Sequence, residues 1–121
     1  MIVYVLGYSE DPSKSSHSAY VLLQVKGYNT IGINPNASRP MIYPSMVTAF
    51  ENGKAAEIVT VYVNAKISSE LKNEFLKVKP KLVIFNPGAE NGELSSILSA
   101  NGIKVKNACT LVMLSQDQLI L

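Results

Sequence analysis

Five short runs of apolar, largely β-branched residues recur along the chain and alternate with segments of helical spacing. These runs are Ile2–Leu6, Thr30–Ile33, Ile58–Val63, Leu82–Phe85 and Ile103–Val105. Short buried strands that alternate with helices are typical of βαβ crossovers, in which parallel strands are joined by helices packed on the sheet. The pattern therefore predicts one three-layer α/β domain with a parallel sheet of about five strands.

The segments between these runs have the spacing and the end signals of helices. Ser15 or Ser16 can cap the first helix and Gly27 can end it, since serine favours N-caps and glycine favours C-terminal stops. Ser68 is the expected cap of a later helix. Thr110–Leu114 is too short to assign to strand or helix. The apolar positions expected to face the core are Ala19, Leu22 and Leu23, then Ile67, Leu71, Phe75 and Val78, and finally Leu94, Ile97 and Leu98.

Small, polar and shape-fixing residues follow several of the predicted strands. They are Gly7-Tyr8-Ser9, Asn34-Pro35-Asn36 and Asn86-Pro87-Gly88, and Asn64 follows the third strand. Ligands of open α/β sheets bind outside the carboxyl ends of the strands, where these loops would meet. Such residues also occur in ordinary turns, but their coincidence at one edge favours a binding site. Exposed backbone N–H groups and a helix N-terminus suit an anion such as phosphate.

Two familiar kinds of nucleotide or phosphate site do not fit the sequence. A dinucleotide site needs G-x-G-x-x-G and an acidic residue after the second strand, whereas Gly7 stands alone and Asn34 follows that strand. Nicotinamide and flavin are therefore not expected. Receiver-type phosphotransfer needs an acidic cluster, but Asp11 and Asp117 are the only aspartates.

Candidate catalytic residues are few. The chain has one histidine, His17, and one cysteine, Cys109, so these residue types cannot form a zinc site. His17 lies where it could meet a phosphate, although a lone exposed histidine is more often incidental. We expect Cys109 to be a buried, unreactive thiol. Glu90 could act as a base or stabilise the start of a helix.

Composition narrows the possible partners. The 121 residues are 47% hydrophobic and 17% charged, with a formal net charge of +2 and basic residues spread along the chain. This balance does not suggest nucleic-acid binding. No apolar run reaches the ~20 residues of a membrane span, and Ile2–Leu6 lacks the features of a signal peptide. We therefore expect a cytoplasmic protein without membrane partners.

The loops taken together resemble a known family. Gly7-Tyr8-Ser9, Pro12-Ser13-Lys14, Gly32-Ile33-Asn34-Pro35-Asn36, Tyr43-Pro44-Ser45 and Asn86-Pro87-Gly88-Ala89-Glu90-Asn91, with Asn107-Ala108-Cys109, are similar in order and spacing to motifs of small stand-alone CoA-binding proteins. That family is in turn similar to the CoA-binding domain of the succinyl-CoA synthetase α subunit. The resemblance spans nearly the whole chain and implies a Rossmann-like domain.

The resemblance also implies a set of ligand contacts. The first loop would wrap the CoA phosphates, and the ends of the next strands would complete the pocket. The synthetase has a basic residue near the position of Ala37, for which Arg39 is the closest substitute here. The implied contacts are Gly7, Tyr8, Ser9, Pro12, Ser13, Lys14, Asn34, Pro35, Asn36, Arg39, Val63, Asn64, Phe85, Asn86 and Pro87.

These observations lead to one leading hypothesis and two alternatives. The leading hypothesis is a protein that binds CoA or an acyl-CoA without catalysing a reaction. The first alternative is another nucleotide or phosphorylated metabolite in the same pocket. The second is an interaction module with a vestigial pocket, in which an exposed apolar patch at Thr110–Leu114 or Leu119–Leu121 drives self-association.

Overall fold

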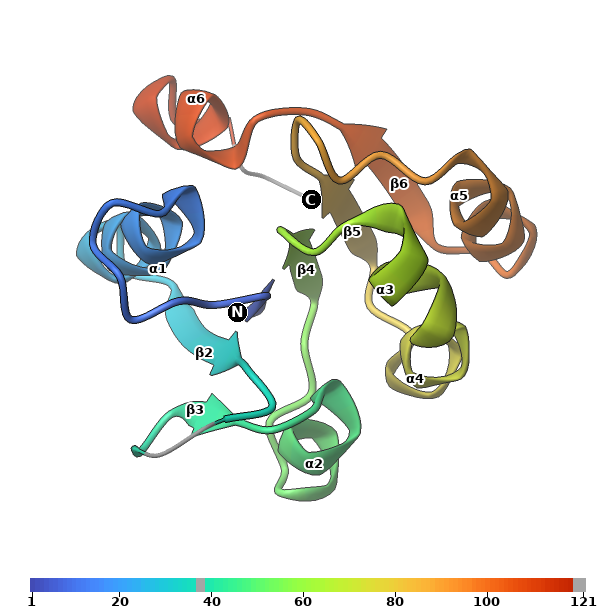
Figure 1. Cartoon of the computed structure of the whole chain (residues 1–121), viewed down its shortest axis with the longest axis horizontal. Helices are drawn as coiled ribbons and strands as arrows, with labels where there is room; N and C mark the ends of the chain where they lie inside the picture. The colour runs from blue at the N-terminus through green and yellow to red at the C-terminus, as the bar shows by residue number, and fades with distance from the viewer. Residues whose placement is uncertain (37–38, 119–121) are drawn as a thin grey trace.

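A parallel six-stranded sheet in the order β3-β2-β1-β4-β5-β6 lies at the centre of the chain (Figure 1). The computed structural model describes residues 1–36 and 39–118, so Ala37 and Leu119–Leu121 lie outside the described residues. The strands are β1 (Ile2–Leu6), β2 (Asn29–Ile33), β3 (Ile42–Tyr43), β4 (Ile58–Val61), β5 (Leu82–Phe85) and β6 (Lys104–Asn107). The helices are α1 (Ser15–Val25), α2 (Met46–Glu51), α3 (Ala65–Glu70), α4 (Lys72–Val78), α5 (Gly92–Ala100) and α6 (Thr110–Ser115).

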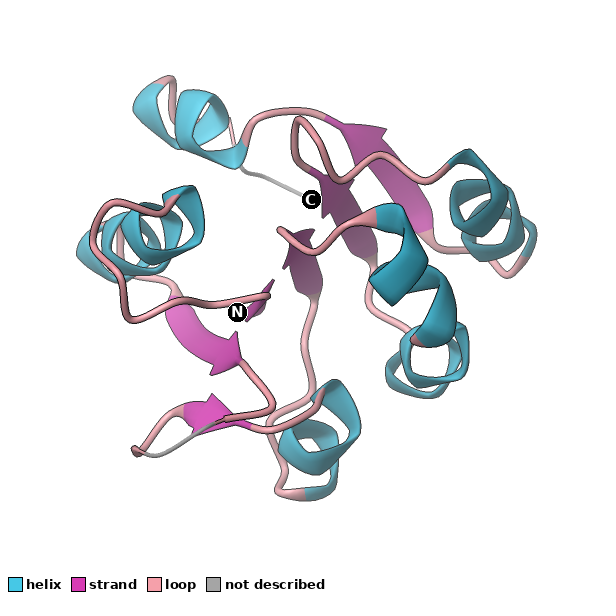
Figure 2. Cartoon of the chain, in the orientation of Figure 1, coloured by secondary structure: helices cyan, strands magenta, loops and turns pink. Residues whose placement is uncertain are grey.

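The predicted Rossmann-like three-layer domain is confirmed, because helices cover both faces of the sheet (Figure 2). Helices α1 and α6 pack side by side on one face, and α2, α4 and α5 pack on the other. The sheet has one strand more than the five apolar runs predicted. This additional strand is β3, which consists of Ile42–Tyr43 and pairs with the end of β2. The segment Thr110–Leu114, which the sequence pattern could not assign to strand or helix, forms most of helix α6.

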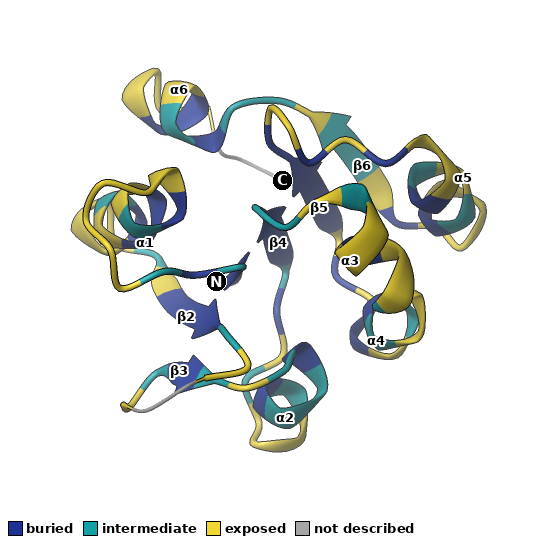
Figure 3. Cartoon of the chain, in the orientation of Figure 1, coloured by how far each residue is buried: buried dark blue, intermediate teal, exposed yellow. Residues whose placement is uncertain are grey.

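Two apolar cores flank the sheet, because successive strand side chains point to opposite faces. Tyr4 and Leu6 of β1 belong to the core beneath α2, α4 and α5, whereas Val3 and Val5 belong to the core beneath α1 and α6. The central strands are buried on both faces (Figure 3), as the continuous β-branched runs predict.

The caps of two helices differ from the prediction. Helix α1 begins at Ser15, and its N-cap residue is Lys14, which provides no side-chain hydrogen bond. Helix α3 is capped by Asn64, whose Oδ1 accepts a hydrogen bond from the Ile67 N–H at 3.0 Å. The predicted cap, Ser68, is buried instead, and its hydroxyl accepts a hydrogen bond from Asn91 Nδ2 at 2.9 Å. A buried serine bound in this way cannot start the helix.

The helical segment after β4 is also not one continuous helix. It breaks at Leu71 into α3 and α4, so that its apolar positions do not form a single buried stripe. Phe75 and Val78 enter the core, whereas Ile67 is 42% exposed. The break therefore leaves Ile67 and Leu71 at the carboxyl edge of the sheet, where they line a cavity.

Candidate functional site

The strand order reverses between β1 and β4, and this point of the carboxyl edge is where open α/β sheets bind ligands. Gly7 directly follows β1 and has a φ of +90°, and a Cβ atom built on it would lie 2.9 Å from Val63 Cγ1. Both its conformation and its surroundings therefore require glycine. The close approach brings the start of the first loop against the segment that follows β4.

A cavity of about 240 Å³ opens beside Gly7. Its walls come from the ends of β1 and β2, the turn between β3 and α2, the segment after β4, and helices α3 and α4. Most of its lining is apolar, and its polar side chains belong to Ser45 and Glu74. The lining residues are Leu6, Gly7, Ile33, Pro35, Pro44, Ser45, Met46, Val63, Ile67, Leu71 and Glu74.

The second loop is bound directly to the first. Asn34 Nδ2 donates to the Tyr8 carbonyl at 2.7 Å, and Asn34 Oδ1 accepts from the Asn36 N–H at 2.8 Å. The N–H groups of Gly7 and Tyr8 both donate to the Ile33 carbonyl at 3.1 Å. The Asn34 amide thus holds the two loops in place around the cavity.

The first loop is closed by its own hydrogen bonds. Asp11 Oδ1 accepts from the Ser13 N–H at 3.0 Å and from the Ser13 hydroxyl at 2.8 Å, and Ser9 Oγ accepts from the Asp11 N–H at 3.1 Å. The bonds from Ser13 hold the pKa of Asp11 below its usual value, so this carboxyl is charged at neutral pH. The hydroxyl of Ser13 is therefore engaged within the loop, while Lys14 remains exposed at the start of α1.

The Tyr8 hydroxyl contacts both members of an ion pair that joins the two loops, Arg39 and Glu10. Arg39 Nη2 donates to the Tyr8 hydroxyl at 3.1 Å, and Arg39 Nε lies 3.3 Å from Glu10 Oε1. The Tyr8 hydroxyl also donates to Glu10 Oε2 at 3.3 Å. On the helix side, the Tyr8 ring stacks on His17, whose Nδ1 lies 3.0 Å from the Ser9 carbonyl. His17 thus supports the loop instead of standing free.

The end of β5 is built differently from the other strand ends. Asn86 is buried, its Nδ2 donates to Thr60 Oγ1 at 2.7 Å and to the Val61 carbonyl at 2.9 Å, and its Oδ1 accepts from the Thr110 N–H at 2.8 Å. Phe85 is also fully buried, whereas Pro87 is exposed. The Asn86 amide therefore attaches α6 to the sheet, and both of its N–H donors are occupied by protein groups.

The structure divides the predicted contacts into separate groups. Gly7, Pro35 and Val63 meet at the cavity, and Arg39 reaches Tyr8 from the second loop. Phe85 and Asn86 do not join them, and Asn64 serves as a helix cap. Five more contacts lie on the two loops, and all of them except the partly buried Ser9 are exposed: Ser9, Pro12, Ser13, Lys14 and Asn36. Asn34 binds the two loops together, and Pro87 is exposed on the separate loop after β5.

Sequence reasoning missed most of the cavity, because only Gly7, Pro35 and Val63 of its lining residues were predicted as ligand contacts. Pro44 and Ser45 follow the short third strand and belong to the quoted family motifs, so they could have been proposed. No sequence signal marks Glu74, because it lies within a helix whose charged residues mostly face solvent. Only the packing of α4 against α2 brings it to this cavity.

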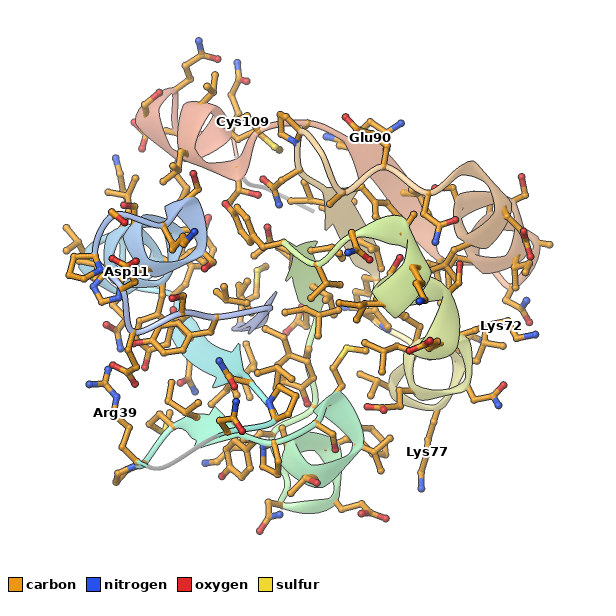
Figure 4. The ribbon with its side chains drawn as sticks, viewed as in Figure 1. Asp11, Arg39, Lys72, Lys77, Glu90 and Cys109 are labelled. Carbon is orange, nitrogen blue, oxygen red and sulfur yellow. The ribbon has the colours of Figure 1, made fainter. Side chains whose placement is uncertain are left out.

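Other candidates lie away from the cavity. Figure 4 places Asp11 and Arg39 on the side of the first loop, and Cys109 and Glu90 near α6 and the end of β5. Cys109 is only partly buried, which corrects the expectation of a buried thiol. Glu90 Oε1 accepts from the Gly88 N–H at 2.9 Å and so closes its own loop. In residues 1–36 and 39–118 no cluster of metal-binding side chains occurs, and no helix there is long and apolar enough to cross a membrane.

Comparisons with known proteins agree with this architecture. Residues 2–115 match a family model described as a CoA binding domain. A solved structure of an uncharacterized protein shares 31% sequence identity, with a TM-score of 0.85 over 98% of this chain and 97% of that one. No curated protein matches the chain significantly.

Two further solved structures resemble the chain at lower identity and support the fold alone. The protein cell-free ID.343 from Thermus thermophilus shares 22% identity, with a TM-score of 0.85 over 98% of this chain and 90% of that one. A hypothetical protein from Pyrococcus horikoshii OT3 shares 23% identity, with a TM-score of 0.83 over 98% of this chain and 83% of that one.

Proposed function

The chain belongs to the CoA-binding domain family, and from this premise we propose that it binds CoA or an acyl-CoA at the carboxyl edge of its sheet without catalysing a reaction. The observation that carries the proposal is the cavity beside Gly7, at the point where the strand order reverses. Pockets for whole drug-sized ligands start at about 300 Å³. The smaller cavity of about 240 Å³ therefore accommodates one apolar part of CoA, and the remainder extends over the loops.

Two cationic side chains on the loops, Lys14 and Arg39, are the proposed partners of the CoA phosphates. Lys14 is exposed at the start of α1, and Arg39 lies over Tyr8 at the side of the first loop. The first N–H groups of a helix have no intrahelical partner, and α1 lacks a side-chain cap that would occupy one of them. Glu10 and Asp11 lie in the same loop and oppose an anion, and because Glu10 pairs with Arg39, a phosphate at Arg39 has to compete with that carboxylate.

The candidate catalytic residues have structural roles or lie away from the cavity, which favours ligand binding without catalysis. His17 and Glu90 each hold a loop through a hydrogen bond to the backbone, and Cys109 lies near α6, away from the cavity (Figure 4). Self-association through Thr110–Leu114 is not favoured, because Met113 and Leu114 are buried and Val112 alone is exposed there. Leu119–Leu121 lies outside the described residues.

A thermal-shift titration of the purified protein tests this function. A ligand at a hundred times its Kd stabilises the fold by about 2.7 kcal/mol, which corresponds to a rise in Tm of roughly 10 °C for a domain of this size. CoA should produce that rise, and Lys14→Ala should reduce it. No shift at millimolar CoA would contradict the proposal. A shift with other nucleotides but not with CoA would favour the alternative ligand class, which native mass spectrometry of freshly purified protein would identify.

A further inference from the structure

Glu74 is the one charged side chain in the wall of an otherwise largely apolar cavity. Its Oε1 accepts a hydrogen bond from the Val47 N–H at 3.4 Å, which is at the long limit for such a bond. A carboxylate can accept about four hydrogen bonds, so most of its capacity remains unused. Among the described residues no cation pairs with it, and Lys77, one turn further along α4, pairs with Glu51 instead.

The other polar side chain of the cavity is already engaged. Ser45 Oγ accepts from the Thr48 N–H at 3.1 Å as the cap of α2, and it shares a second hydrogen bond with Thr48 Oγ1 at 2.9 Å. Among the side chains that line this cavity, the unused hydrogen-bonding capacity is therefore an acceptor on Glu74. A ligand group that buries this carboxylate without donating a hydrogen bond would leave a charge without a partner, which is costly.

This chemistry distinguishes the two ends of CoA. Adenine is a flat ring with apolar faces and an exocyclic amine that donates hydrogen bonds. An aliphatic acyl chain would place only apolar atoms against the carboxylate, and the amide N–H groups of the pantetheine arm belong to a flexible chain and not to a flat ring. The volume of about 240 Å³ suits a ring system and not the whole molecule. From this cavity, the ribose and phosphates can continue past Gly7 and Pro35 to the first loop.

We infer that the cavity holds the adenine ring and that Glu74 accepts a hydrogen bond from its amine, which makes Glu74 the residue that selects adenine over rings with a carbonyl at that position. The inference rests on the proposed CoA binding and adds the identity of the group in the cavity. A hydrogen bond to a charged acceptor contributes enough for about a ten- to hundredfold difference in affinity. A carbonyl oxygen facing the carboxylate would lose this bond and add repulsion.

The test measures the affinity of CoA and of its deaminated analogue, in which hypoxanthine replaces adenine. Wild-type protein should bind CoA at least tenfold more tightly than the analogue. Glu74→Gln should bind the two within about threefold of each other, because the glutamine amide can accept from an amine or donate to a carbonyl. Glu70→Gln, an exposed substitution in α3 outside the cavity lining, should retain the wild-type preference.

A fragment experiment identifies which end of CoA enters the cavity. Glu74→Ala, which removes the acceptor altogether, should weaken adenosine 3′,5′-bisphosphate at least tenfold and leave 4′-phosphopantetheine unchanged. The opposite result, or an equal preference for CoA and its analogue in wild-type protein, would overturn the assignment of the cavity while CoA binding itself stands. Failure of wild-type protein to bind CoA at all would overturn the proposed function and this inference with it.

Discussion

Arg39 and Glu10 form an ion pair between the second and first loops, with 3.3 Å between Arg39 Nε and Glu10 Oε1. Both side chains are about half exposed, and the pair lies against the ring of Tyr8, whose centroid is 6.0 Å from Arg39 Cζ. Arg39 is a predicted ligand contact, and its guanidinium is already paired with Glu10. A phosphate of CoA would have to displace the Glu10 carboxylate to bind this cation. The carboxylate is therefore an internal competitor for the proposed ligand.

Replacement of Glu10 by glutamine should strengthen CoA binding. Exposed ion pairs contribute at most about 1 kcal/mol, so we expect a gain in affinity of no more than about fivefold in calorimetric titrations. The gain should shrink at high salt, since salt screens exposed charges. Glu93→Gln, an exposed change in α5, is the matched control and should leave affinity unaltered. Weaker binding by the Glu10 variant would indicate that Glu10 positions Tyr8 for the ligand.

Replacement of Gly7 by alanine should destabilise the fold through two separable effects. The residue has a φ of +90°, and its new Cβ would lie 2.9 Å from Val63 Cγ1. Gly27→Ala is a matched control, because Gly27 has a φ of +92° with no atom within 4 Å of the added Cβ. Urea unfolding should give a cost of about 1 kcal/mol at Gly27 and about 2–4 kcal/mol at Gly7. Equal costs would show that Val63 moves freely and that the close approach is not tight.

Tyr62 and Tyr4 should respond in opposite ways to loss of the hydroxyl. The buried Tyr62 hydroxyl lies near those of Thr60 and Thr110 but makes no hydrogen bond of normal geometry, whereas the Tyr4 hydroxyl donates to the Lys54 carbonyl. We therefore expect Tyr62→Phe to be neutral or stabilising at pH 7, and Tyr4→Phe to cost about 1 kcal/mol in chemical denaturation. A large destabilisation by Tyr62→Phe would mean that its hydroxyl is satisfied in solution.

The same two tyrosines should make the fold sensitive to alkaline pH. Burial raises the pKa of each of them to about 12, against 10.0 for an exposed tyrosine. Between these values the unfolded chain loses tyrosine protons that the folded chain keeps, so the free energy of unfolding falls as pH rises from 10 towards 12. Tyr62→Phe should reduce the slope of that decline, measured by urea unfolding across the range. An unchanged slope would show that Tyr62 does not titrate differently in the two states.

The sequence by itself determined the architecture. Continuous β-branched runs can be buried on both faces of a sheet, and the helical spacing between them requires crossovers, so the parallel three-layer fold follows from local patterns. The sequence also leads to the prediction of a site at the carboxyl edge, because the turn residues after β1 and β2 can be recognised in the chain. Gly7 and Pro35 were identified in this way and do line the cavity.

Only the tertiary structure decided how each of these polar residues is used. Asn34, Asn64 and Asn86 look alike in sequence, yet one binds loop to loop, one caps a helix and one attaches α6 to the sheet. Their partners are hydrogen-bonding groups whose positions depend on the packing of the whole domain. Glu74 reaches the cavity for the same reason, since α4 packs against α2, and no local pattern encodes that contact.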